Sequence, residues 1–232
     1  MSINNADNSS KVLTYGYKHA LKFIIYLILF YLAFSVLAGF ALYVMESGKL
    51  ADFATLRLTL FFSVLLAHVT TMRKAALVLH ISRENFLISL AFVLLSTFTF
   101  VIFLLLTLLM NNPVENIKLA SISQVTNKGE MLFLLFLTSV VVPVYEEIIS
   151  RFHLVNVLRK LVNSNFFVVI VSSAFFALLH TQYQGLGLFL PFCFGVLFCI
   201  ARIVTGSIVP GIFMHGIANA IWFFHENLIL IR

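Results

Sequence analysis

Seven long apolar runs, separated by short polar segments, dominate the hydrophobic pattern of the chain. They lie near residues 19–45, 53–72, 86–110, 131–157, 166–181, 186–204 and 207–223. Each run is long enough, or nearly so, to cross a bilayer as a helix, which takes about 20 residues. The pattern therefore predicts an all-α fold, a polytopic membrane helical bundle of about seven transmembrane helices.

Polar stretches divide this bundle into three parts. We expect residues 1–18 to form a cytoplasmic tail, because their start is polar and carries no cleavage pattern of a signal peptide. Residues 19–128 would hold the three amino-terminal transmembrane helices and a polar connection, whose middle could lie on the membrane surface as an interfacial helix. Residues 129–232 would form the helical core that carries the chemistry of the chain.

Composition agrees with a membrane protein and excludes a soluble domain. Hydrophobic residues make up 61% of the chain and charged residues only 10%, with a mean hydropathy of +1.05. The formal net charge is +6, but the basic residues are scattered between apolar runs, so we expect no nucleic-acid partner and the lipid bilayer as the surroundings.

Basic residues also predict the orientation of the chain. Nine of them fall in loops on one side of the seven predicted helices: Lys11, Lys18, Lys22, Arg73, Lys74, Arg83, Arg159, Lys160 and Arg202. Because cytoplasmic loops carry an excess of Lys and Arg, we expect a multi-pass protein of the cell (cytoplasmic) membrane with a cytoplasmic amino terminus.

Two adjacent glutamates are the only carboxylates deep within an apolar run. A charged side chain at the bilayer centre costs roughly 2.5 to 3.5 kcal/mol, so Glu146 and Glu147 must be functional or strongly paired. Glu147 and Arg151 are four residues apart and share a helix face, which predicts a buried ion pair. Glu146 points about 100° away and is left to face a cavity. Pro143 should kink the helix just before the pair.

Two histidines on later helices reinforce this interpretation. His180 ends the fifth apolar run, and His215 lies four residues before Asn219 in the last one. Gly211 and Gly216 remove bulk beside His215 and so permit close helix approach. A single histidine on such a helix is usually a packing residue. Two histidines on separate helices, together with Asn219 and the glutamates, favour a functional site.

The order Glu-Glu-x-x-x-Arg, Phe-x-x-x-His and His-x-x-x-Asn resembles the CPBP intramembrane protease family, also called the Abi or type II CAAX prenyl protease family. The resemblance covers roughly residues 131–222. It implies an intramembrane endopeptidase in which Glu146 and His180 activate a water molecule. It also implies that His215 and Asn219 stabilise the oxyanion, while Glu147 and Arg151 organise the site.

Cofactor and substrate follow from the same resemblance. A carboxylate and two imidazoles suit a catalytic zinc ion, so Glu146, His180 and His215 would be its ligands if a metal is bound. The sequence has no His-Glu-x-x-His motif, and we expect a glutamate-dependent mechanism that requires no cofactor, with zinc possible. The expected partner is a membrane-associated peptide or protein substrate.

Two other functions remain open. The same polar residues could form the relay of a proton-coupled transporter, although the sequence shows no repeats of the kind that many transporters carry. A non-catalytic membrane immunity or scaffold protein would keep the fold and act by binding. Outside the motifs, Arg57 is expected to extend to a membrane interface, and His68 and His153 are expected to be packing or interfacial residues.

Overall fold

The structure, a computed structural model, describes residues 17–44, 49–72, 83–109, 127–180 and 188–229. Within these residues the regular structure is entirely helical, which confirms the all-α membrane bundle. Most of the predicted cytoplasmic tail and of the predicted interfacial connection lies outside the described residues. The division of the chain into three parts therefore stays a prediction.

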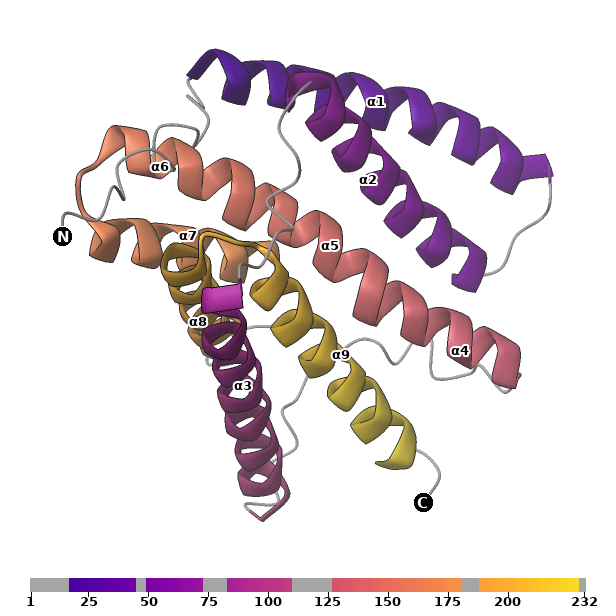
Figure 1. Cartoon of the computed structure of the whole chain (residues 1–232). Helices are drawn as coiled ribbons and strands as arrows, with labels where there is room; N and C mark the ends of the chain where they lie inside the picture. Colours follow the sequence, from indigo (N-terminus) through magenta and orange to yellow (C-terminus); the bar gives the residue numbers. More distant parts are fainter. Residues whose placement is uncertain (1–16, 45–48, 73–82, 110–126, 181–187, 230–232) are drawn as a thin grey trace, which may run out of the picture.

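The helices in chain order agree with the seven predicted runs. They are α1 (Tyr17–Val44), α2 (Lys49–Met72), α3 (Arg83–Leu109), α4 (Lys128–Phe136), α5 (Val142–Glu147), α6 (Val155–Leu161), α7 (Asn165–Leu179), α8 (Phe189–Thr205) and α9 (Val209–Ile229). Two π-helical segments, η1 (Leu137–Val141) and η2 (Ile148–Leu154), join α4, α5 and α6. These five pieces form one continuous helical segment, called here the central helix (Figure 1).

The described helices differ in how well they match a bilayer. Four segments are long and apolar enough to span: Tyr17–Phe40, Leu50–Met72, Asn85–Leu105 and Lys128–Leu161. Helices α7 and α8, with 15 and 17 residues, are shorter than a full crossing. The central helix is the most enclosed of the four spans. Half of its apolar window is buried, against 6% of that of α1.

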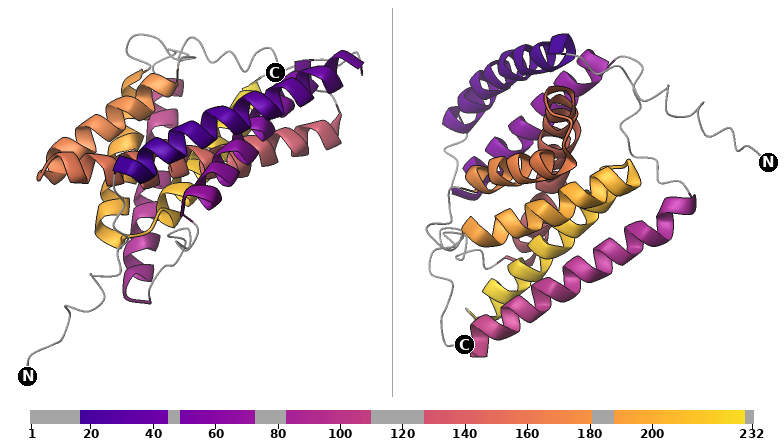
Figure 2. Two further views of the ribbon diagram at one scale, coloured as in Figure 1. Left: turned by 90° about the horizontal axis from the view of Figure 1, so that it is seen from above. Right: turned by 90° about the vertical axis from the view of Figure 1, so that its left-hand side faces the viewer.

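The other helices pack on two sides of the central helix. Helices α1 and α2 pair with each other, and α2 contacts α5, η1 and η2 on one side (Figure 1). Helix α9 contacts η1 and α5, and α3 packs against α8 and α9 (Figure 2). Helix α7 packs against α8, α6 and η2. The carboxyl end of α5 therefore lies within reach of α2, α7 and α9.

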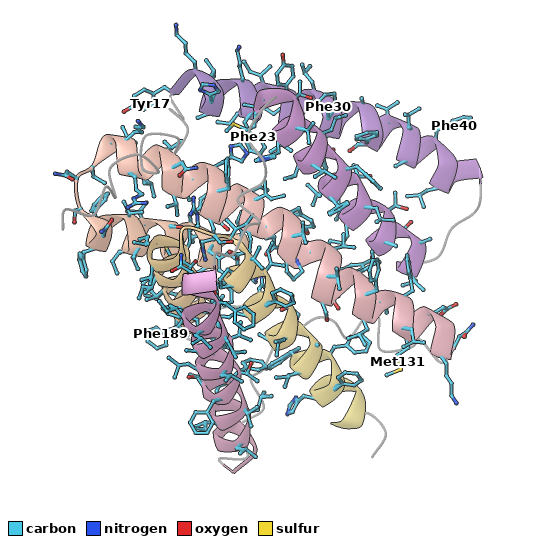
Figure 3. The ribbon with its side chains drawn as sticks, viewed as in Figure 1. Tyr17, Phe23, Phe30, Phe40, Met131 and Phe189 are labelled. Carbon is cyan, nitrogen blue, oxygen red and sulfur yellow. The ribbon has the colours of Figure 1, made fainter. Side chains whose placement is uncertain are left out.

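The outer helices present apolar side chains to the surroundings, as a lipid-embedded protein requires. Phe40 on α1 is 70% exposed and Phe189 at the start of α8 is 66% exposed, whereas Phe23 faces inward and is buried (Figure 3). Phe23 stacks on the ring of His153, with centroids 3.5 Å apart. His153 in turn contacts His68 of α2 through ring nitrogens 3.0 Å apart. Both histidines are buried, in agreement with a packing role.

A proline explains the irregular course of the central helix. Pro143 has no backbone N–H, so a regular helix would lose a hydrogen bond here. The chain widens into η1 directly before Pro143, and the Val142 N–H bonds to the Leu137 carbonyl five residues back. The structure thus shows a π-helical turn beside Pro143, where the sequence predicts a kink, and the segment then continues as a helix to Leu161.

Candidate active site

Three side chains from three separate helical elements meet beside the carboxyl end of α5. Glu146 comes from α5, His180 caps the end of α7, and His215 lies on α9. The Nε2 atoms of His180 and His215 lie 3.9 and 3.8 Å from the same oxygen, Oε2 of Glu146. One ligand atom from each residue lies within 4.8 Å of the others. The fold thus assembles the acid and the two imidazoles that the sequence motifs single out.

The carboxylate oxygen at the centre of this group accepts no direct hydrogen bond from a described residue. This oxygen, Oε2 of Glu146, is buried. Its distances to the two imidazole nitrogens are longer than those of hydrogen bonds, which usually measure 2.7 to 3.2 Å. A buried carboxylate oxygen without a hydrogen-bond donor is costly. A small polar molecule bound between Glu146 and the two histidines would supply this missing hydrogen bond.

A backbone carbonyl fixes the tautomer of His180. Nδ1 of His180 lies 2.8 Å from the carbonyl oxygen of Phe176, one turn earlier in α7. A carbonyl only accepts, so Nδ1 must carry the proton and donate. In the neutral ring the lone pair is then on Nε2, the nitrogen that faces Glu146. The ring of Phe176 also packs on His180, with centroids 4.5 Å apart, as the spacing of four predicts.

His215 lies between the two adjacent glutamates. Its Nε2 faces Glu146, and its Nδ1 lies 3.7 Å from Oε1 of Glu147. The ring is buried and stacks on Phe198, with centroids 5.6 Å apart. Because both nitrogens face carboxylate oxygens, a protonated His215 would interact favourably with both acids. Adjacent residues of a helix point in different directions, and His215 therefore contacts both Glu146 and Glu147 although their side chains diverge.

Arg151 is held on the far side of Glu147. Its Nε lies 3.6 Å from Oε2 of Glu147, and both side chains have no exposed surface. Nη1 of Arg151 donates to the hydroxyl of Ser172 at 2.9 Å, and the guanidinium lies over the ring of Phe176 at 4.8 Å. The predicted ion pair between Glu147 and Arg151 is confirmed. The distance of 3.6 Å between Nε of Arg151 and Oε2 of Glu147 is longer than that of a hydrogen bond. The helix between the two residues is widened, because Arg151 lies in the π-helical segment η2.

Two glycines of α9 make room for these side chains. A Cβ atom added at Gly211 would lie 2.6 Å from Oε2 of Glu147, and one at Gly216 would clash with the carbonyl oxygen of Ser139. Real Cβ atoms essentially never come this close. The close approach of α9 that the sequence predicts from these glycines is thus present at the site.

Asn219 makes a contact that the sequence does not reveal. Its Nδ2 donates to the backbone carbonyl of Thr138 at 2.9 Å. In a helix this carbonyl would accept from Val142 or Pro143, but the Val142 N–H is bonded to Leu137 and Pro143 has no N–H. Asn219 therefore supplies the hydrogen bond that the proline removes, as neighbouring helices do in membranes. Its second amide hydrogen is not used by this bond.

Replacing Asn219 with alanine is expected to lower stability by about 1 to 3 kcal/mol, because the Thr138 carbonyl loses its donor. The loss should be smaller in a Pro143→Ala background, where residue 143 regains an N–H. The thermal midpoint in detergent measures both effects, with exposed Asn163→Ala as the control. Unchanged stability of Asn219→Ala would show that this hydrogen bond is unimportant for the fold.

Two residues near the site cannot be recognised from the sequence alone. Arg57 of α2, whose position at a membrane interface stays a prediction, is half-buried and donates from Nη1 to the hydroxyl of Tyr145 at 2.9 Å. Tyr145 is buried and directly precedes Glu146. The available signal was a lone arginine inside the apolar run 53–72. Only the packing of α2 on α5 reveals which residue it meets.

The donor set also fits a metal ion. Glu146, His180 and His215 offer one carboxylate and two imidazoles, a set known from catalytic zinc sites. The carbonyl of Phe176 orients His180 in the way that outer partners orient metal-bound histidines. A zinc ion bound here would lower the pKa of a bound water and polarise a carbonyl group. The same donors equally suit a water molecule.

Fold and site together define a class: a multi-pass membrane protein whose buried centre joins a carboxylate to two imidazoles. Residues 128–221 match the family model described as type II CAAX prenyl endopeptidase Rce1-like. This part of the chain, less than half of its length, is therefore Rce1-like, in agreement with the family resemblance of the motifs. The match supports a CAAX-type intramembrane endopeptidase. No curated protein and no solved structure matches the chain.

Proposed function

We propose that the protein is an intramembrane endopeptidase that hydrolyses a peptide bond of a membrane-associated peptide or protein through a water molecule activated by Glu146 and His180. The observation that carries the proposal is the buried Oε2 of Glu146, which lies 3.9 and 3.8 Å from the two imidazole nitrogens and accepts no hydrogen bond from a described residue. The Rce1-like match of residues 128–221 supports the same reaction class.

Each residue of the cluster has a role in this reaction. Glu146 accepts the proton of the attacking water, and the unprotonated Nε2 of His180 orients that water. His215 donates to the oxyanion of the tetrahedral intermediate, with the second amide hydrogen of Asn219 as a further donor. Glu147 and Arg151 hold His215 and the helix in position.

The proposal includes no obligatory metal, and zinc content tests this. The purified protein is expected to hold much less than one zinc per chain and to keep its activity after treatment with a chelator. Stoichiometric zinc, loss of activity on chelation and recovery with added zinc would instead assign Glu146, His180 and His215 as metal ligands. Metal analysis and peptide cleavage before and after chelation measure the outcome.

The cellular setting belongs to the proposal as well. The apolar helices and the family support a multi-pass membrane protein. We place it in the cell membrane with a cytoplasmic amino terminus, on the distribution of basic residues in the loops. The active centre would then be reached by substrates held in the bilayer.

The test of this function compares cells that carry the wild type with cells that carry Glu146→Gln. Membrane proteins and released peptides are compared by mass spectrometry. An uncut substrate should accumulate only with the variant, and its cleavage product should appear only with the wild type. Identical peptide profiles in the two strains would contradict the proposal. The cleavage site found in this way also supplies substrate peptides for the purified protein.

A further inference from the structure

Arg202 is a buried cation in the last turn of α8. Only 8% of its surface is exposed, and its Nε donates to the backbone carbonyl of Arg151 at 3.4 Å. Among the side chains that the structure places, no acid forms an ion pair with Arg202, and neither of its Nη nitrogens donates a hydrogen bond. A buried charge is costly unless it is paired. We therefore expect an anion from outside the chain beside Arg202.

A second cation lies near Arg202 on the neighbouring helix α6. Arg159 is exposed in the last turn of α6, and its like charge acts unfavourably on Arg202. A buried cluster that includes Leu158 and Cys199 joins the two helices at this point. Leu158 directly precedes Arg159 in α6, and Cys199 lies in the turn of α8 before Arg202. Like charges on packed helices repel each other, and an anion between them removes the repulsion.

Cations gather at this end of the bundle. Arg159 and Lys160 lie in the last turn of α6, and Arg202 lies in that of α8. Outside the active site, the acids whose side chains the structure places include Asp52 and Glu130, in the first turns of α2 and α4. Both of these first turns lie towards the other end of the central helix (Figure 1). The charges of the placed side chains therefore favour an anion at the α6 end.

Exposed apolar side chains border the same cations. Leu161 follows the basic pair of α6, and Phe166 lies in the first turn of α7. Helices α7 and α8 pack antiparallel, with Gly195 of α8 against Ser173 of α7. Seven residues in opposite directions from this contact lead to Arg202 and Phe166, which therefore lie at about the same height. An anion that carries acyl chains fits this surface better than a free one.

We propose that Arg202 and Arg159 bind the phosphate group of an anionic phospholipid, whose acyl chains lie along Leu161 and Phe166. Guanidinium groups present paired N–H donors that match phosphate oxygens. The loop charges predict that this end faces the cytoplasm, where basic pockets between membrane helices bind anionic headgroups. The phosphate neutralises the buried Arg202 and relieves its repulsion from Arg159. Because Arg202 also donates to the Arg151 carbonyl, the lipid is held close to the backbone of the active-site segment.

The test measures lipid binding to the purified full chain in detergent micelles, by native mass spectrometry and by the thermal midpoint. Dioleoylphosphatidylglycerol is expected to bind about 10-fold or more tightly than dioleoylphosphatidylcholine, whose choline cation offsets the phosphate. At saturation it should raise the midpoint by about 5 °C or more. Arg202→Gln should weaken its binding by about 10-fold or more, and exposed Arg159→Gln by about 3-fold or more.

Two controls separate this role from a structural one. Lys128→Gln removes an exposed cation at the start of α4 and should bind phosphatidylglycerol as the wild type does. Without anionic lipid, Arg202→Gln should keep the wild-type midpoint within about 2 °C, because it removes an unpaired buried charge. Arg159→Gln should also keep it, and as an exposed replacement it tests the site even if Arg202→Gln does not fold.

Several results would overturn the inference. Equal affinities of the wild type and both variants for phosphatidylglycerol would do so, as would equal affinities of the wild type for the two lipids. If Arg202→Gln lowers the midpoint equally with and without phosphatidylglycerol, the role of Arg202 is structural. Inorganic phosphate tests the source of the anion. If it raises the midpoint as much as phosphatidylglycerol, and Arg202→Gln abolishes this rise, the ligand is a free phosphate and the lipid site is wrong.

Discussion

Purified Glu146→Gln is expected to lose peptide hydrolysis by about 100- to 10,000-fold while remaining folded. Glutamine has nearly the shape of glutamate, but its amide cannot accept the proton of the attacking water. The Glu146 side chain is 12% exposed and makes no hydrogen bond through Oε2, so the neutral replacement removes little that the fold needs. Cleavage of the peptide from the cellular comparison, and the thermal midpoint in detergent, measure the two expectations.

A matched control lies on the same helical segment. Glu130 is exposed in the first turn of α4, away from the site, and Glu130→Gln is expected to keep wild-type activity. Substantial hydrolysis by Glu146→Gln would exclude Glu146 as the base. A cellular effect that persists in the inactive variant would favour an immunity or scaffold role. Flux of protons in liposomes that Glu146→Gln abolishes would favour the transporter.

The fold could be predicted because lipid leaves a chain few choices. Backbone groups in a bilayer must be satisfied internally, so long apolar runs must be helices. The same cost makes polar residues inside these runs stand out. This is why Glu146, Glu147, His180 and His215 could be selected from the sequence before their side chains were known to meet.

The remaining features depend on contacts between distant segments. Pro143 within an apolar run predicts a disturbed helix. The sequence does not reveal, however, that Asn219 of another helix donates to the Thr138 carbonyl, which is left without a backbone donor. Arg57 similarly has an apolar neighbourhood in the sequence, and its hydrogen bond to Tyr145 arises from the packing of α2 on α5. The partners of Asn219 and Arg57 lie on other helices, so only the packing of the helices determines them.

The second large effect concerns the buried ion pair, and here stability should change most. Arg151→Met removes the cation from Glu147, whose side chain has no exposed surface, and leaves a buried carboxylate that faces only the imidazole of His215. Breaking such a pair by removing one partner usually costs about 3 to 5 kcal/mol. Exposed Arg159→Met should stay within about 0.5 kcal/mol of the wild type. Equilibrium unfolding in mixed micelles measures both.

The double variant Glu147→Gln, Arg151→Met distinguishes the missing charge partner from lost packing. Arg151 also contacts the Ser172 hydroxyl and the Phe176 ring, so some loss should remain after the carboxylate is neutralised. If the unpaired charge causes most of the damage, the double variant should regain most of the stability that Arg151→Met loses, since neutral replacements remove the buried charge. Equal stability of the single and double variants would assign the effect to packing instead. His215 also faces Glu147, so the double variant should remain impaired in hydrolysis even where its stability returns.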